Sequence, residues 1–195
     1  MESNKRKQKT QTLVLGAIFT ALVIILQSLA VYTTFFGPFS TAVGLIPIVI
    51  GAAMCGVGVG AWLGFVFGMV VLLTGNAALF LAFNIPGTII TVLSKGIACG
   101  FAAGIVYKLL AKFNQWVAVI AAGIICPVVN TTVFLLGCYL FFMKHAEAIA
   151  GQVGLNVSGM ALFWAIAMGN FIFELATNAL LSPVITRVLT IKRKI

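Results

Sequence analysis

Residues 12–32 read TLVLGAIFTALVIILQSLAVY, and this stretch decides the fold class of the chain. It contains no charged residue, and its length matches the ~20 apolar residues that an α-helix needs to cross a bilayer. The chain around it stays free of Asp, Glu, Lys, Arg and His from residue 10 to residue 94. Because a soluble domain cannot bury so long a charge-free run, the sequence predicts an integral membrane protein.

Six membrane-spanning helices fit the rest of the chain. We predict them at residues 12–32, 41–55, 58–74, 86–110, 116–143 and 159–189, after a basic N-terminal tail at residues 1–11. The second and third share one apolar stretch, which we divide at Gly56–Gly60 because glycines weaken a helix and allow a tight turn. Pro183 is expected to bend or end the regular part of the last helix. The prediction is a single all-α membrane domain.

The basic residues predict the orientation of these helices. With six spans, one side of the membrane carries Lys5, Arg6, Lys7, Lys9, Lys108, Lys112, Arg187, Lys192, Arg193 and Lys194. The opposite side carries only Lys144, in one of three longer outer loops at residues 33–40, 75–85 and 144–158. The positive-inside rule then places both termini in the cytoplasm. This rule also accounts for the net charge of +9 without nucleic acid as a partner.

Polar residues at membrane depth indicate a candidate binding site. Lys95 interrupts the fourth span, and Glu174 is the only acid at comparable depth. A charge in the hydrocarbon costs at least ~2.5–3.5 kcal/mol on insertion scales, so each needs a partner, a cavity or a ligand. Residues four apart share a helix face, which groups further polar side chains with these two. The candidate binding residues are Lys95, Asn130, Asn170, Glu174, Asn84, Thr91, Asn178 and Trp164.

Two interpretations of these polar residues stay open. In the first, they converge on a cavity for a small polar molecule between the last three helices, under the outer loops. In the second, Asn and Thr side chains only join helices, and Lys95 pairs with Glu174. A purely structural ion pair could be replaced by apolar residues at little cost, which favours the binding site.

Small residues form two close-packing patterns. The first helix has Gly16 with Thr20 and Ala17 with Ala21 at spacings of four, and the third helix has glycines at 60, 64 and 68. Such strips let a neighbouring helix approach closely in a membrane. The spacing alone does not decide between a neighbour in the same chain and a partner protein.

The inventory of reactive residues excludes several functions. The chain has no Asp, no H-E-x-x-H, G-x-S-x-G or P-loop motif, and one histidine, His145, in an outer loop. Its four cysteines lack a C-x-x-C spacing and are expected to be buried free thiols. We therefore expect no enzyme, no metal site and no cofactor. Any energy for uphill transport must come from another protein.

Taken together, these features resemble the substrate-binding S components of energy-coupling-factor (ECF) vitamin transporters. The resemblance covers nearly the whole chain and depends on the order and spacing of four strings. These are GLIPIVIG at 44–51, GAWLGFVFG at 60–68, NTTVF at 130–134 and NFIFE at 170–174. They are most similar to the subgroup associated with pantothenate. Lys95 stands where that subgroup tends to carry an arginine, so carboxylate recognition would persist with a different geometry.

The resemblance implies a function and partners. It implies high-affinity capture of a water-soluble vitamin, with pantothenate the best single candidate, at the plasma membrane of a bacterium. It also implies docking on a transmembrane coupling subunit with two cytoplasmic ATPase subunits, through Ala17 and Ala21, with Gly16 and Thr20 as further candidate docking residues. Alternatives are riboflavin, a pyridoxine-like ligand or a thiamine precursor, for which Trp164 could supply a stacking ring. A structural membrane protein or a self-sufficient channel are alternatives from other classes.

Overall fold

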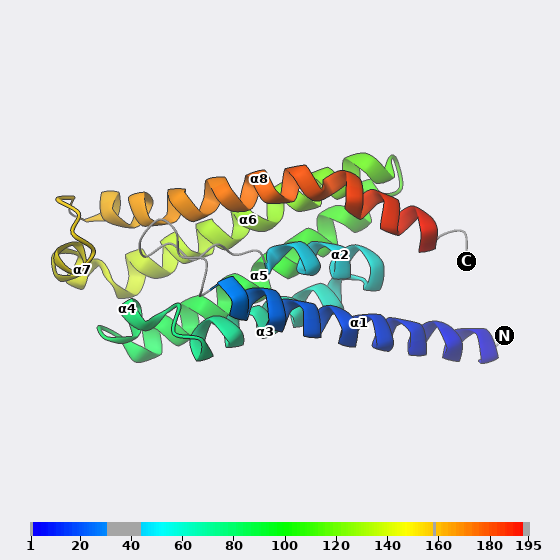
Figure 1. Cartoon of the computed structure of the whole chain (residues 1–195), viewed down its shortest axis with the longest axis horizontal. Helices are drawn as coiled ribbons and strands as arrows, with labels where there is room; N and C mark the ends of the chain where they lie inside the picture. The colour runs from blue at the N-terminus through cyan, green and yellow to red at the C-terminus, as the bar shows by residue number, and fades with distance from the viewer. Residues whose placement is uncertain (1, 31–43, 158, 193–195) are drawn as a thin grey trace.

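The computed structural model describes residues 2–30, 44–157 and 159–192, and in these ranges it consists of helices joined by short turns and loops, with no strand (Figure 1). The helices are α1 (Glu2–Ala30), α2 (Leu45–Cys55), α3 (Val57–Leu73), α4 (Ala78–Leu81), α5 (Ile85–Leu110), α6 (Gln115–Phe141), the 3₁₀ helix η2 (Met143–His145), α7 (Ala146–Val153) and α8 (Met160–Lys192). This confirms the predicted all-α class.

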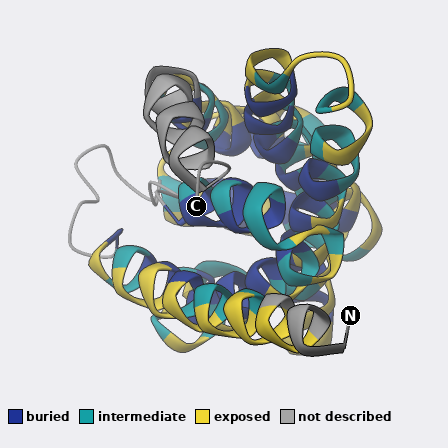
Figure 2. Ribbon diagram, turned by 90° about the vertical axis from the view of Figure 1, so that its right-hand side faces the viewer, coloured by how far each residue is buried: buried dark blue, intermediate teal, exposed yellow. Residues whose placement is uncertain are grey.

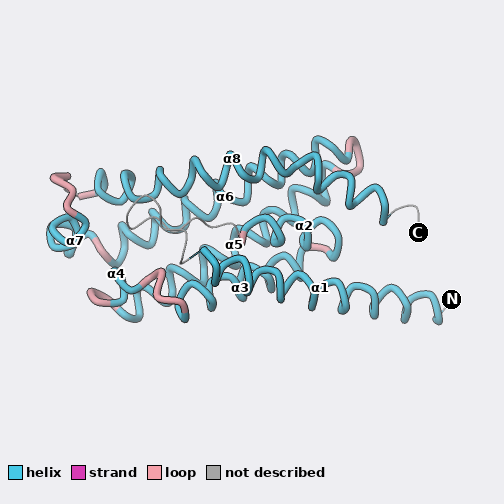
Figure 3. The backbone as a smooth tube through the Cα atoms, in the orientation of Figure 1, coloured by secondary structure: helices cyan, strands magenta, loops and turns pink. Residues whose placement is uncertain are grey.

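The long helices lie side by side along the length of a bundle. α1 begins and α8 ends at one end, which we call the terminal end, whereas α4 and α7 lie at the other end, the loop end (Figure 1). The short connections from α2 to α3 and from α5 to α6 lie toward the terminal end (Figure 3). This arrangement brings the basic residues of α1 and of the α5–α6 connection toward the same end.

In the described part of the chain, four helices are long and apolar enough to cross a membrane. They are Lys9–Ala30 of α1, Ile85–Leu110, Gln115–Phe141 and Met160–Asn178 of α8. The 11 residues of α2 are too few for a span, because they rise about 16 Å and the hydrocarbon core is ~30 Å thick. Residues 41–43 of the predicted second span lie outside the described residues. Six spans and their orientation therefore stay a prediction.

The bounds of α1 and α8 refine the prediction. α1 begins at Glu2 and so includes the basic tail. The Lys, Arg and Gln residues of the tail favour helix, and the tail has no Gly or Pro that would interrupt it. α8 continues past Pro183 to Lys192, which agrees with the predicted span to residue 189 and excludes an end of the helix at the proline. A proline removes one backbone hydrogen bond, and membrane helices often continue past that loss.

Glycines bring α3 and α5 into close contact. Gly60 faces Gly100, and Gly64 faces Gly96, so the two helices run antiparallel. A Cβ added at Gly64 would collide with the backbone carbonyl of Gly96, and the reverse substitution would collide as well. Small residues are typical of such contacts in membranes, where van der Waals packing drives association. The glycine strip of the third helix thus packs within the protein. It fixes the position of α5, the helix that carries Lys95.

The bundle is apolar both inside and outside. Seen from the terminal end, buried residues lie where the helices face one another and exposed residues lie on the outer sides (Figure 2). The outer sides carry large apolar residues, and Trp62, Trp116 and Trp164 are each at least half exposed. Such a surface suits a bundle surrounded by lipid, whose tails are as apolar as these side chains.

Candidate functional site

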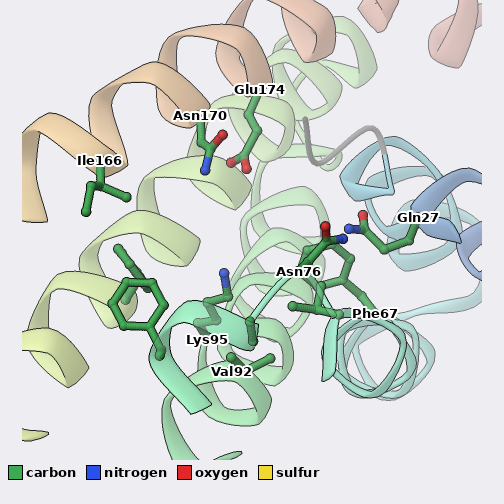
Figure 4. A pocket seen from close by; sticks show the side chains of 12 residues that line it. Gln27, Phe67, Asn76, Val92, Lys95, Ile166, Asn170 and Glu174 are labelled. Atoms are coloured by element: carbon green, nitrogen blue, oxygen red, sulfur yellow. The ribbon is translucent and has the colours of Figure 1, made fainter. Parts of the chain in front are cut away.

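A cavity lies inside the helical bundle. The centre of a water molecule could move through about 70 Å³ of it. A site for a single water needs ~10–15 Å³ by the same measure, so the cavity is several times larger. It is lined by Gln27, Phe67, Val71, Asn76, Ala77, Phe80, Val92, Lys95, Phe134, Ile166, Asn170 and Glu174 (Figure 4). These residues come from α1, α3, α4, α5, α6 and α8 and from the turn between α3 and α4. The cavity therefore extends beyond the last three helices, between which the sequence placed the site.

Lys95 and Glu174 face one another from different walls of this cavity (Figure 4). The structure describes both side chains and shows no ion pair between them. The Lys95 ammonium lies 5.2 Å from the centre of the Phe134 ring, within the range of a cation–π contact. Lys95 is half-buried, and Glu174 is buried. The simple structural pairing that the sequence left open is thus not formed, and the ammonium is open to an anion in the cavity.

Asn130 positions the Glu174 carboxylate. Its Nδ2 atom donates from α6 to both carboxylate oxygens on α8, at 3.3 and 3.5 Å, and both side chains are buried. The Oδ1 atom of Asn130 has no hydrogen-bond partner among the described residues. Asn130 thus holds Glu174 and does not itself line the cavity.

Asn170 lies one helical turn from Glu174 and lines the cavity with it. Its side chain points into the same space (Figure 4). Its buried Oδ1 atom finds no hydrogen-bond partner within the part of the chain that the structure describes. The α8 wall therefore presents a carboxylate and an amide side by side.

The other four candidate residues do not line this cavity. Asn84 caps α5, where its Oδ1 accepts a hydrogen bond from the Gly87 amide at 2.9 Å. Thr91 is buried against Gly137 of α6, and Asn178 is buried further along α8. Trp164 is half exposed on the outside of α8. The position of Asn84 has a structural explanation, because its side chain caps the helix.

The two small-residue pairs on α1 separate onto different faces. Thr20 donates to the Gly16 carbonyl at 2.8 Å and accepts from the Trp62 indole of α3 at 3.3 Å. A Cβ added at Gly16 would lie 3.6 Å from Val59 of α3. Ala17 and Ala21 are exposed. The first pair faces α3, and the second belongs to the free side of α1.

Two polar residues of the cavity were missed by the reasoning from sequence. Gln27 is fully buried on α1, although a glutamine in an otherwise apolar span is a recognisable sign of a functional site. Asn76 lies in the turn after α3, and the sequence assigned that turn to an outer loop. A search for polar side chains in all the spans, not only the last three, would have found Gln27.

Comparison with known proteins accords with this architecture. No curated protein matches the chain. The family model described as ECF transporter, substrate-specific component, matches residues 11–189, which is nearly the whole sequence. Together with the apolar helices, this match indicates a multi-pass membrane protein. The chain belongs to the family of substrate-specific components of ECF transporters.

Proposed function

We propose that this chain binds a water-soluble acidic vitamin or vitamin precursor, with pantothenate the best single candidate. Family membership supplies the general role, since a substrate-specific component binds what its transporter takes up and works with other transporter components, ATPases among them. The observation that carries the proposal is the Lys95 ammonium, which lines the cavity without an ion-pair partner among the described residues. A carboxylate in the cavity would supply that partner.

The opposite wall supports the same ligand class. Glu174 and Asn170 together offer hydrogen-bond acceptors and a donor. Pantothenate has a carboxylate at one end and an amide and two hydroxyls beyond it. Its carboxylate would face Lys95 in a charge-assisted contact, and its amide hydrogen would be donated to an oxygen of the α8 wall. Few polar groups in a mostly apolar pocket are the usual means of fixing a ligand's orientation.

The position of the cavity supports capture from outside the cell. Asn76, Ala77 and Phe80, from the α3–α4 turn and α4, place the cavity toward the loop end. In the proposed topology, six helices cross a bacterial plasma membrane, both termini are cytoplasmic, and the loop end faces outward. The ligand would then enter from the outside, between the loops.

The exposed face of α1 supports a docking role. α1 packs against α2 and α3, and Ala17 and Ala21 stay exposed. We assign this strip, as the resemblance implies, to the transmembrane coupling subunit, which would in turn bind two cytoplasmic ATPase subunits. Alanines permit the close helix approach that association in a membrane requires.

An aromatic vitamin is a second candidate, and one observation favours it. Phe67, Phe80 and Phe134 all line the cavity, and rings can stack on an aromatic ligand. Riboflavin, a pyridoxine-like molecule and a thiamine precursor belong to this class. Trp164, the ring that the sequence suggested for this purpose, lies outside the cavity.

Mass spectrometry of small molecules released from the purified, denatured protein tests the proposal. Stoichiometric release of pantothenate would support it, and binding to a panel of vitamins would give the same result independently. A neutral aromatic vitamin in stoichiometric amount would favour the second candidate. Absence of any ligand, with no binding across the panel, would contradict vitamin binding and favour a structural membrane protein.

A further inference from the structure

We propose a second recognition subsite in the cavity, formed by Gln27 of α1 and Asn76 of the α3–α4 turn. It hydrogen-bonds the neutral polar end of a ligand whose carboxylate faces Lys95. This inference rests on the proposed function and narrows the substrate class. The ligand is a small organic acid with hydroxyl or amide groups at the end remote from its carboxylate.

Gln27 is the first reason for this subsite. Its side chain is fully buried and lines the cavity. Neither its Nε2 nor its Oε1 atom has a hydrogen-bond partner among the residues that the structure describes. Buried amides are nearly always hydrogen-bonded in native proteins, because an unsatisfied polar group costs free energy. A ligand in the cavity supplies the partner that the described residues do not.

Packing holds the Gln27 amide in place. Phe19, Val23 and Ala30 are buried on the same face of α1, so this face is turned into the bundle. A Cβ added at Gly44 would lie 3.0 Å from the Gln27 Oε1 atom, which shows how closely the α2 backbone approaches it. The amide is therefore positioned before any ligand arrives, and such preorganisation lowers the entropic cost of binding.

Asn76 adds a second amide on the same side of the cavity. Figure 4 shows its side chain beside that of Gln27, at a distance from Asn170 and Glu174. Its Nδ2 atom donates only a long, local hydrogen bond of 3.4 Å to the Thr74 hydroxyl. Two amides from different elements thus meet at one wall of the cavity.

The polar residues of the cavity differ in chemistry. Lys95 and Glu174 carry charge on two facing walls, whereas Gln27 and Asn76 carry neutral amides that both donate and accept. An inorganic anion or a fatty acid would use only the charged residues and leave the amides unsatisfied. A site built to hydrogen-bond a ligand group discriminates strongly against analogues that lack the group. The pair therefore selects an acid with a second polar end.

The binding of two probes to the parent protein and to three variants tests this subsite. The probes are pantothenate and N-(3,3-dimethylbutanoyl)-β-alanine, which keeps the carboxylate and the amide but lacks both hydroxyls. We expect the parent protein to bind pantothenate at least about 10-fold more tightly, and Gln27→Met to remove most of that preference by weakening pantothenate alone. Lys95→Met should weaken both probes by a similar factor. Gln11→Met, the same change at an exposed position of α1, is the matched control and should leave both affinities unchanged.

Folding of the variants is controlled separately. Methionine matches glutamine in length and removes polar atoms from membrane depth, so Gln27→Met should insert and run as a single species on size exclusion. Asn76→Leu is a second variant on a different element, with the same expected loss of preference, and it decides the case if Gln27→Met does not fold.

The outcomes separate this inference from the proposed function. If both variants keep the parent's preference for pantothenate, the subsite is refuted, and vitamin binding stands. If the parent protein binds both probes equally, the hydroxyls are not recognised, and the subsite is again refuted. If the parent binds neither probe nor any other acidic vitamin, the proposed function fails, and the subsite fails with it.

Discussion

Replacing Lys95 by methionine removes the charge on which the acid-ligand proposal depends while keeping most of the side chain's bulk. Among the described residues that line the cavity, Lys95 is the one cation, and it makes no ion pair with Glu174, whose side chain is described as well. Removing one partner of a buried charge pair typically costs ~2–5 kcal/mol. Because Lys95 is only half-buried, we expect the lower part of this range, about 2–3 kcal/mol. This corresponds to about 30- to 150-fold weaker binding.

The assay is titration of purified protein in detergent with pantothenate. The yield of Lys95→Met should not fall, because removing a charge at membrane depth lowers the cost of insertion. Lys144→Met, at an exposed position of η2, is the matched control and should bind as the parent does. Glu174→Gln should have a smaller effect on an acidic ligand, since glutamine can still accept from Asn130, and a larger effect on a cationic one. Unchanged affinity of Lys95→Met would refute the role of the ammonium.

Three further predictions concern docking, topology and packing. Ala17→Trp should abolish uptake and spare ligand binding, because a bulky residue blocks helix approach, whereas Ala165→Trp on the exposed side of α8 should leave both uptake and binding unchanged. Normal uptake by Ala17→Trp would refute the docking role of this strip. A cysteine at exposed Ala148 of α7 should react with external reagents in intact cells, while tags at both termini stay protected; labelled termini would reverse the orientation. Gly64→Ala should lower the midpoint of thermal unfolding, since its Cβ collides with α5. Gly58→Ala should not lower it, because a Cβ there meets open space. Equal midpoints for the two variants would show that α3 and α5 can move apart without loss of stability.

The fold class could be predicted because one physical constraint dominates it. A charge-free run from residue 10 to residue 94 belongs in lipid, and lipid admits helices because they satisfy their own backbone. Helix bounds followed less well, since propensity extends α1 through the basic tail to Glu2. α2 is shorter than the apolar stretch that predicted it. Apolar patterns locate helices in a membrane, but they do not show where the helix within such a stretch begins.

The candidate site, too, could be predicted only in part from the sequence. Asn170 and Glu174 could be paired from sequence because a spacing of four places them on one face of α8. Gln27 has no polar residue four positions away, so helix periodicity gave no sign of the face to which it belongs. Only the packing of α1 against α2 and α3 turns it into the cavity. Residues from one helix can be grouped by spacing, whereas walls contributed by separate helices need the tertiary structure.

The two faces of α1 connect the proposed binding site with the proposed docking surface. Gln27 lines the cavity, and Ala21 is exposed about 9 Å along the same helix, since six residues rise 1.5 Å each. A ligand that contacts Gln27 and a coupling subunit that packs on Ala21 would therefore both bind the same rigid element. By thermodynamic linkage, if a bound ligand changes the affinity for the coupling subunit by some factor, docking changes the affinity for the ligand by the same factor. A displacement of α1 would be one way to make docking depend on whether the cavity is filled.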